Sequence, residues 1–430
     1  MNESIIYNID SLTLFMPLKK DPLFCVLKKI ACLSDVSHIV LLWSKFVFLC
    51  VKENVNSESF FDIVFNKTLQ NENLWTLAVE RSAETERLNL LAEQDLQKLH
   101  NIASLDIIKL AENIAAVLKN DKSEATEEIS KNIMAQAKVL CMSSAASKNN
   151  FTINYFLKYI KQHGAGVLAS GTMFYWCPHK NNLYPASYPD KIMLKDLSGY
   201  EDQRNIIISN TQRFLDGRGV SNNLLLYGDR GSGKSATVKA VSNEYAQRRL
   251  RLIEVRKNNL NLLPNLIDKL KNRSSLKFII FIDDLSFEEG GSEFNMLKAY
   301  LEGGIETKPK NIVIYATSNR RHLVKEKLID RPASTGDVRA FDTMQEQLSL
   351  ADRFGVTVIF ASPSQEEYLR IAIFIAKNNG ILPQDVTEEQ LKEFKENALK
   401  WERWFNGRSP RTAVQFVQWT AGGSGYPWEG

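Results

Sequence analysis

Apolar residues recur at helical spacing through the first third of the chain. The last such helix is the clearest, because four apolar residues follow the i, i+3, i+4, i+7 pattern of one helix face: Ile153, Phe156, Leu157 and Ile160. Glycine is absent from residues 1–163, and Pro17 and Pro22 are the only prolines there, so helix breakers are almost missing. We expect an all-α domain over residues 1–165, whose apolar stripes form either a bundle core or a face that docks a partner.

The pattern changes in residues 166–190, where glycines, prolines and aromatic residues alternate. Glycine and proline are the residues that most often interrupt regular structure. This composition is typical of a connector between domains.

From residue 191 onward, apolar runs alternate with helical patterns. Continuous apolar runs are typical of parallel strands that are covered on both faces. We therefore expect an α/β domain over residues 191–362, a helical segment over 363–421 and a flexible tail over 422–430. The five runs expected to form a parallel sheet are Asn223–Tyr227, Arg251–Val255, Lys277–Asp283, Asn311–Thr317 and Val356–Phe360.

Composition excludes several classes of protein. The chain has 430 residues, enough for two or three domains, and its 44% hydrophobic and 24% charged residues exclude disorder and collagen-like repeats. A net charge of +4 is too small to indicate a nucleic-acid footprint. Five scattered cysteines without a CxxC pair favour a reducing compartment. The most apolar stretch, Ile39–Val51, is interrupted by Ser44 and Lys45 and is shorter than a membrane helix. We expect a soluble, cytoplasmic protein with no membrane partner.

One glycine-rich motif matches the P-loop pattern GxxxxGK[ST] between an apolar strand and a helix. Glycines let backbone N–H groups curl around phosphate oxygens, and the helix N-terminus adds partial positive charge. Lys234 is expected to reach the β- and γ-phosphates and Ser235 to bind Mg²⁺. The alternative is a glycine-rich turn that binds nothing. The residues expected to bind nucleotide are Gly228, Asp229, Arg230, Gly231, Ser232, Gly233, Lys234, Ser235 and Ala236.

A second motif is the apolar run Phe278–Ile282 followed by Asp283 and Asp284, which matches a Walker B strand. Asp283 is expected to help hold Mg²⁺, and Asp284 to orient or deprotonate the attacking water. Many P-loop ATPases have Glu at the second position, which leaves Glu288 or Glu289 as alternative bases.

Three further residues lie where a nucleotide could be sensed. Asn319 follows the fourth strand, at the sheet edge where ligands bind, but asparagine also serves in turns. Arg353 lies at a helix end before the fifth strand; it is either an arginine finger for a neighbouring subunit or a cation at a helix C-terminus. Arg411 lies in the first turn of a helix, where it either reads phosphate or is a solvated surface residue. We expect Asp284, Asn319, Arg353 and Arg411 to be catalytic.

Together these motifs resemble AAA+ ATPases over residues from about 189 to 419. Four segments are also similar to the bacterial ATP-binding family catalogued as domain of unknown function 815: residues 225–231, 283–288, 316–323 and 348–355. The resemblance implies an α/β AAA+ core with a five-stranded parallel sheet and a C-terminal helical lid. It further implies ATP and Mg²⁺ as cofactors and a homo-oligomer with shared active sites.

Three functions fit these observations. The first is an ATPase that couples ATP hydrolysis to remodelling or loading an unidentified protein or nucleic-acid partner. The second is a switch that binds ATP with little hydrolysis. The third is a P-loop kinase, which would not need an arginine before the fifth strand or a helical lid carrying Arg411.

Overall fold

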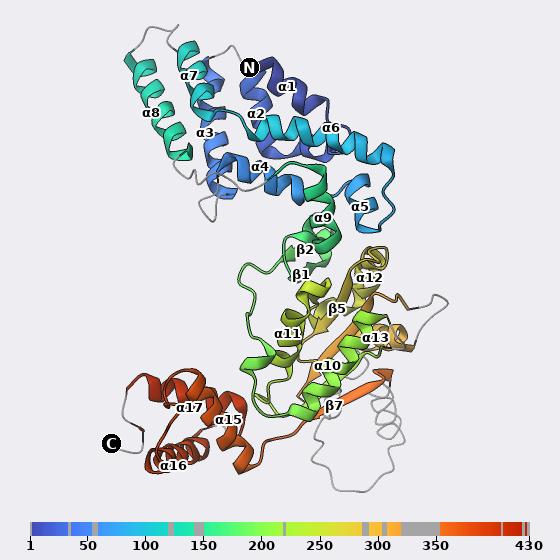
Figure 1. The fold of residues 1–430 in the computed structure, drawn as a ribbon, viewed down its shortest axis with the longest axis vertical. Helices are drawn as coiled ribbons and strands as arrows, with labels where there is room; N and C mark the ends of the chain where they lie inside the picture. The colour runs from blue at the N-terminus through green and yellow to red at the C-terminus, as the bar shows by residue number, and fades with distance from the viewer. Residues whose placement is uncertain are drawn as a thin grey trace. The chain divides into compact units, whose positions relative to one another are not determined.

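A computed structural model describes most of the chain (Figure 1). The described residues are 2–32, 36–53, 59–118, 124–141, 150–217, 221–285, 292–302, 308–319, 353–405, 407–423 and 426–427. The chain forms two compact units, Met1–Gly171 and Thr172–Gly430.

The described residues of the first unit form helices joined by turns, and no strand occurs among them. Its helices are α1 (Asn2–Asp10), α2 (Pro22–Cys32), α3 (Val36–Glu53), α4 (Phe60–Leu69), α5 (Leu74–Glu80), α6 (Glu86–Ala103), α7 (Ile107–Leu118), α8 (Glu124–Cys141) and α9 (Ile153–His163). A single hydrophobic cluster fills the space between them, with Trp43, Phe46 and Trp75 almost fully buried. The stripe on α9 follows the expected pattern, because Phe156 and Ile160 join this cluster.

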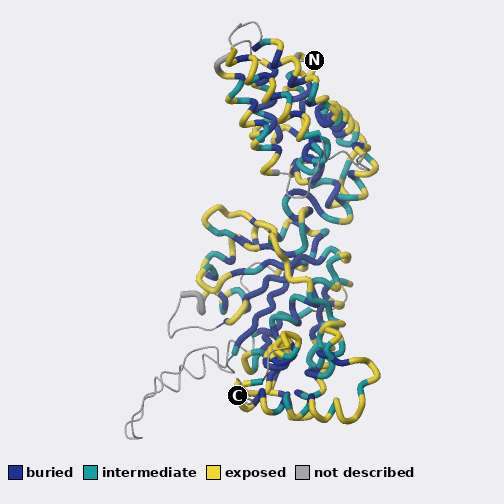
Figure 2. Tube along the Cα trace, turned by 90° about the vertical axis from the view of Figure 1, so that its left-hand side faces the viewer, coloured by how far each residue is buried: buried dark blue, intermediate teal, exposed yellow. Residues whose placement is uncertain are grey.

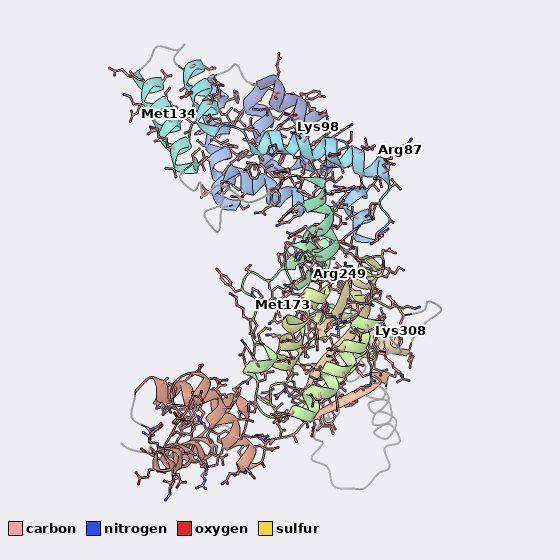
Figure 3. The ribbon with its side chains drawn as sticks, viewed as in Figure 1. Arg87, Lys98, Met134, Met173, Arg249 and Lys308 are labelled. Atoms are coloured by element: carbon pink, nitrogen blue, oxygen red, sulfur yellow. The ribbon has the colours of Figure 1, made fainter. Side chains whose placement is uncertain are left out.

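A buried carboxylate fixes the segment between α1 and α2 to α6. Oδ2 of Asp95 accepts hydrogen bonds from the backbone N–H groups of Thr13, Leu14 and Phe15, at 2.8, 2.8 and 3.1 Å. Its Oδ1 accepts one from Lys98 Nζ at 3.1 Å; Lys98 is labelled in Figure 3. A buried charge needs such partners, so this contact sets the path of the chain in a region that lacks regular structure.

The second unit contains one sheet of seven strands in the order β2-β1-β4-β5-β6-β3-β7. The strands are β1 (Met173–Cys177), β2 (Asn182–Pro185), β3 (Leu224–Gly228), β4 (Leu250–Glu254), β5 (Lys277–Ile282), β6 (Ile312–Ser318) and β7 (Val356–Phe360). Only β2 runs antiparallel to its neighbour. The interior strands are among the most buried parts of the chain, as Figure 2 shows in dark blue.

The five expected strands are present, but the expectation of a five-stranded sheet was wrong. The additional strands, β1 and β2, lie in the segment expected to be a connector. Met173, Phe174 and Trp176 are buried, and β1 pairs in parallel with β4. Aromatic side chains favour strands, and here that preference outweighed the nearby glycines and prolines. The left-handed conformation of Asn181, with φ of 41°, helps turn the chain back into β2.

Helices cover the sheet and continue beyond it. Residues of α10 (Glu201–Asp216) and α11 (Lys234–Glu244) share one buried cluster with alternate strand residues. Among the residues that the structure describes, the sheet domain also contains α12 (Leu263–Lys271) and α13 (Ser292–Glu302). Beyond β7, three helices enclose a separate small core that includes Tyr368, Trp401 and Phe416. These C-terminal helices are α15 (Gln365–Asn378), α16 (Glu388–Trp404) and α17 (Pro410–Ala421).

Side-chain caps mark the starts of these three helices. Ser364 and Thr387 each form a capping box, and Ser409 caps α17 ahead of Pro410. None of the helices in the described ranges combines the length and apolar character needed to cross a membrane.

Candidate nucleotide-binding site

The glycine-rich loop begins where two strands come unusually close. Gly228 ends β3 with φ of 147°, and a Cβ atom there would lie 1.9 Å from the carbonyl oxygen of Phe360 in β7. The adjacent N–H of Asp229 donates to that same oxygen at 3.2 Å. No side chain fits in this space, so the first glycine of the motif is required by packing as well as by its backbone conformation.

The loop also contacts the C-terminal helices. Gly231 has φ of 80°, and a Cβ atom there would approach Ser409 Oγ and Arg411 Cβ at 3.0 Å. The backbone N–H of Arg411 donates to the Gly231 carbonyl at 3.2 Å. The start of α17 is thereby held against the loop, which brings Arg411 to the same site.

Lys234 is the first residue of α11 and has its ammonium group buried in the loop. Its Nζ donates to the carbonyls of Gly228 and Asp229 at 2.9 and 2.8 Å, and the residue is 6% exposed. Burial lowers the pKa of Lys234, while the carboxylates of Asp229, Asp283 and Asp284 act in the opposite direction. An anionic ligand would add to those charges and favour the charged form of the lysine.

The start of α11 supplies further donors. The first turn of a helix has N–H groups without intrahelical partners, and its N-cap, Gly233, has no side chain to satisfy them. Backbone donors and the lysine ammonium therefore lie together, which is the chemistry that binds phosphate.

The two acidic residues after β5 are held differently. Ser235 Oγ and Thr317 Oγ1 both donate to Oδ1 of Asp283, at 2.6 and 2.5 Å. Asp284 has φ of 51°, a left-handed conformation that is rare outside glycine, and its Oδ1 accepts from Asn319 Nδ2 at 2.7 Å. The left-handed turn and the amide of Asn319 therefore fix the orientation of the second carboxylate.

A cleft of about 850 Å³ joins most of the expected residues. It is lined from the loop side by Arg230, Gly231, Ser232, Gly233, Lys234, Ser235 and Ala236, from the strand ends by Asp283, Asp284 and Asn319, and from α17 by Arg411. Residues separated by about 180 positions in the chain therefore share one site.

Three expected residues do not line the cleft: Gly228, Asp229 and Arg353. The carboxylate of Asp229 accepts hydrogen bonds from the backbone N–H and the hydroxyl of Ser362, at 3.1 and 2.5 Å, which links the loop to the segment before α15. Arg353 does not line the cleft; its guanidinium lies 2.5 Å from Oε1 of Glu302 at the end of α13. The alternative bases, Glu288 and Glu289, lie outside the described residues.

The ligand set suits a small, hard cation that also binds phosphate. The side chains of Ser235 and Asp283 are joined by a hydrogen bond, and both carry oxygen atoms, the ligands that Mg²⁺ prefers. Among the described residues there is no group of three or more His, Cys, Asp or Glu side chains that could hold a metal by itself. Phosphate oxygens and water would complete the coordination, as is usual for Mg²⁺.

Some lining residues were not identified from the sequence. The lining of the cleft also includes the apolar residues Ile192, Leu197, Ile371, Ile375 and Val414. No local motif marks these residues, because three segments far apart in the chain contribute them. Thr317 also lines the cleft, and the only signal for it was its place two residues before Asn319.

These features define a class of fold: a mostly parallel α/β sheet with a glycine-rich loop after one interior strand and paired carboxylates after another. The chain belongs to the family described as protein of unknown function (DUF815), whose model matches residues 169–424. The family expected from the sequence is thereby confirmed.

Other comparisons add little. A point variant of RuvB from Thermotoga maritima is similar at 15% identity and a TM-score of 0.34, with 53% of this chain and 63% of that chain covered. The chain thus spans less than two thirds of the RuvB chain, and likeness at this level carries no argument about function. No curated protein matches the chain.

The loop geometry makes a direct prediction for Gly228. We expect Gly228→Ala to lower the midpoint of thermal unfolding, because the new methyl group would overlap the Phe360 carbonyl as well as strain the backbone. Gly380→Ala is the matched control: Gly380 also has positive φ, 70°, but open space around it. Equal shifts for the two variants, measured by calorimetry, would show that the close approach to Phe360 is unimportant.

Proposed function

We propose that this chain is an AAA+ ATPase that couples ATP binding and hydrolysis to remodelling or loading a macromolecular partner. The observation that carries the proposal is the single cleft lined by Lys234, both acidic residues, Asn319 and Arg411. A glycine-rich turn without a ligand would not need a buried ammonium group and two carboxylates facing one space.

The residues divide into those that bind and those that act on water. Lys234 and the N-terminus of α11 would bind the phosphates, and the apolar lining residues of the cleft would hold the base of the nucleotide. Ser235 and Asp283 would hold Mg²⁺, which when bound neutralises charge that develops on the phosphates. The three C-terminal helices would act as the lid, with Arg411 reading phosphate from α17.

Asp284 is the proposed base or water-orienting residue. It lies one residue beyond the metal ligand, and Asn319 fixes its carboxylate by a 2.7 Å hydrogen bond. The same amide could turn to a phosphate oxygen when nucleotide is bound, which would release the carboxylate for water.

The alternative is a switch that binds ATP and hydrolyses it slowly. The Asn319–Asp284 bond favours this possibility, because an amide that holds the carboxylate competes with water for it. Aspartate is also one methylene shorter than the glutamate common at this position. Turnover measurements separate the two functions.

We further propose that subunits share active sites in a homo-oligomer. Arg353 precedes β7, which is the edge strand beside β3, so it lies toward the outer edge of the sheet. To act on a neighbour's phosphate it would exchange its Glu302 partner for that anion. The partner being remodelled would be a protein or a nucleic acid.

The phosphate contact is tested by Lys234→Ala. A lost charge-assisted contact is worth about 2–3 kcal/mol, so ATP should bind roughly 30- to 150-fold more weakly in titration calorimetry. The control is Lys239→Ala on the same helix, whose lysine pairs with Asp190 outside the cleft and should leave binding unchanged. An unchanged ATP affinity in Lys234→Ala would refute the P-loop assignment.

The hydrolytic role is tested by Asp284→Asn. The amide keeps the size of the side chain but cannot accept a proton, so turnover should fall by about 10²–10⁴-fold while ATP–Mg²⁺ binding stays near the wild-type value. Phosphate release and equilibrium binding are measured in parallel. Unchanged turnover would exclude Asp284 as the base, and negligible turnover in the wild type would favour the switch.

Shared sites are tested with Arg353→Ala. Each subunit should still bind ATP, but turnover should fall by about 10³-fold or more, since an arginine finger acts mainly on transition-state charge. Mixing with Lys234→Ala subunits should restore part of the activity, whereas the exposed Arg403→Ala control should behave as wild type. A turnover rate per subunit that does not change with protein concentration, in a protein that stays monomeric with ATP, would contradict a shared site.

A further inference from the structure

Thr317 joins the two acidic residues of the candidate site. It lies in β6, next to β5, and its hydroxyl is the donor in the 2.5 Å bond to Asp283 Oδ1. The hydroxyl oxygen of Thr317 also accepts a hydrogen bond from the backbone N–H of Asp284 at 3.0 Å. One buried hydroxyl therefore contacts the side chain of the first acid and the backbone of the second.

The backbone of Thr317 holds the next residue as well. Its carbonyl accepts from the N–H of Leu285 at 2.7 Å. Thr317 thus fixes three consecutive residues after β5, at the point where the chain leaves the sheet with Asp284 in a left-handed conformation. Such a strained turn persists only where its surroundings hold it in place.

The bonds on Asp283 are unevenly distributed between its two oxygens. Oδ1 accepts from Ser235, Thr317 and the N–H of Asp284, whereas no donor among the described residues reaches Oδ2. Three donors fix the rotation of the carboxylate and leave one oxygen available to a cation. A β-branched side chain suits this task, because its χ1 angle is restricted in a strand.

We propose that Thr317 is a positioning residue for hydrolysis: it orients Asp283 toward Mg²⁺ and holds the turn that aims Asp284 at water. This inference rests on the proposed function. Thr317 is 2% exposed, and it acts through the two acids rather than by contact with the nucleotide. Removing such an outer-shell partner of a metal ligand costs about 10- to 100-fold in metal affinity or activity.

The test compares Thr317→Val with Thr317→Ser. Valine keeps the shape and the strand preference but lacks the hydroxyl, whereas serine keeps the hydroxyl. Thr317→Val should lower turnover by about 10- to 100-fold and raise the Mg²⁺ concentration for half-maximal rate, while Mg²⁺-free ATP affinity stays unchanged. Thr317→Ser should stay within a few-fold of wild type in both measurements.

Two further measurements keep the outcomes distinct. Thermal unfolding of each variant shows whether the fold is retained, and Thr317→Ala offers a second hydroxyl deletion if valine proves unstable. In a double-mutant cycle, Thr317→Val should have little added effect on Mg²⁺ dependence once Asp283→Asn is present, because both changes act on one ligand.

The result that overturns the inference is a folded Thr317→Val or Thr317→Ala protein with wild-type turnover and Mg²⁺ dependence. Equal defects in Thr317→Val and Thr317→Ser would also overturn it, since the hydroxyl would then not matter. If the wild type itself shows no Mg²⁺-dependent ATP binding or turnover, the proposed function fails instead, and the two failures are distinguishable.

Discussion

The close approach of β3 to β7 is the constraint on which the rest of the nucleotide site depends. With Gly228 against the carbonyl of Phe360, the chain must leave the sheet in a conformation that only glycine adopts easily. The glycine-rich loop starts from this fixed point, and the same carbonyl accepts the N–H of Asp229. The position of the loop is therefore set by backbone packing in the sheet, before any ligand is bound.

The loop is tied to the C-terminal helices at two places. The carboxylate of Asp229 holds Ser362, just before α15, and the carbonyl of Gly231 accepts the N–H of Arg411 at the start of α17. The segment before α15 is also held from the start of α10, because the hydroxyl of Tyr200 donates to the Ala361 carbonyl at 2.6 Å. Movement of the loop and movement of these helices are thus mechanically linked.

Much of this architecture could be predicted from the sequence, because its signals are local. The loop motif, the apolar run before Asp283 and the capping residue Thr387 each act within a few positions. Strands β1 and β2 could not, since the pairing of β1 with β4 and of β2 with β1 decides their structure. Thr317 and the Asp229–Ser362 bond were missed because they depend on residues 33 or more positions away.

The hairpin formed by β1 and β2 has a consequence for solubility. A parallel sheet that ended at β4 would expose a row of unpaired backbone groups to other chains. Here β1 covers that row, and the new edge is the four-residue strand β2, which ends in Pro185. Proline lacks an N–H donor, and so short a strand presents few groups to pair with. This side of the sheet is therefore protected against growth by edge-to-edge aggregation.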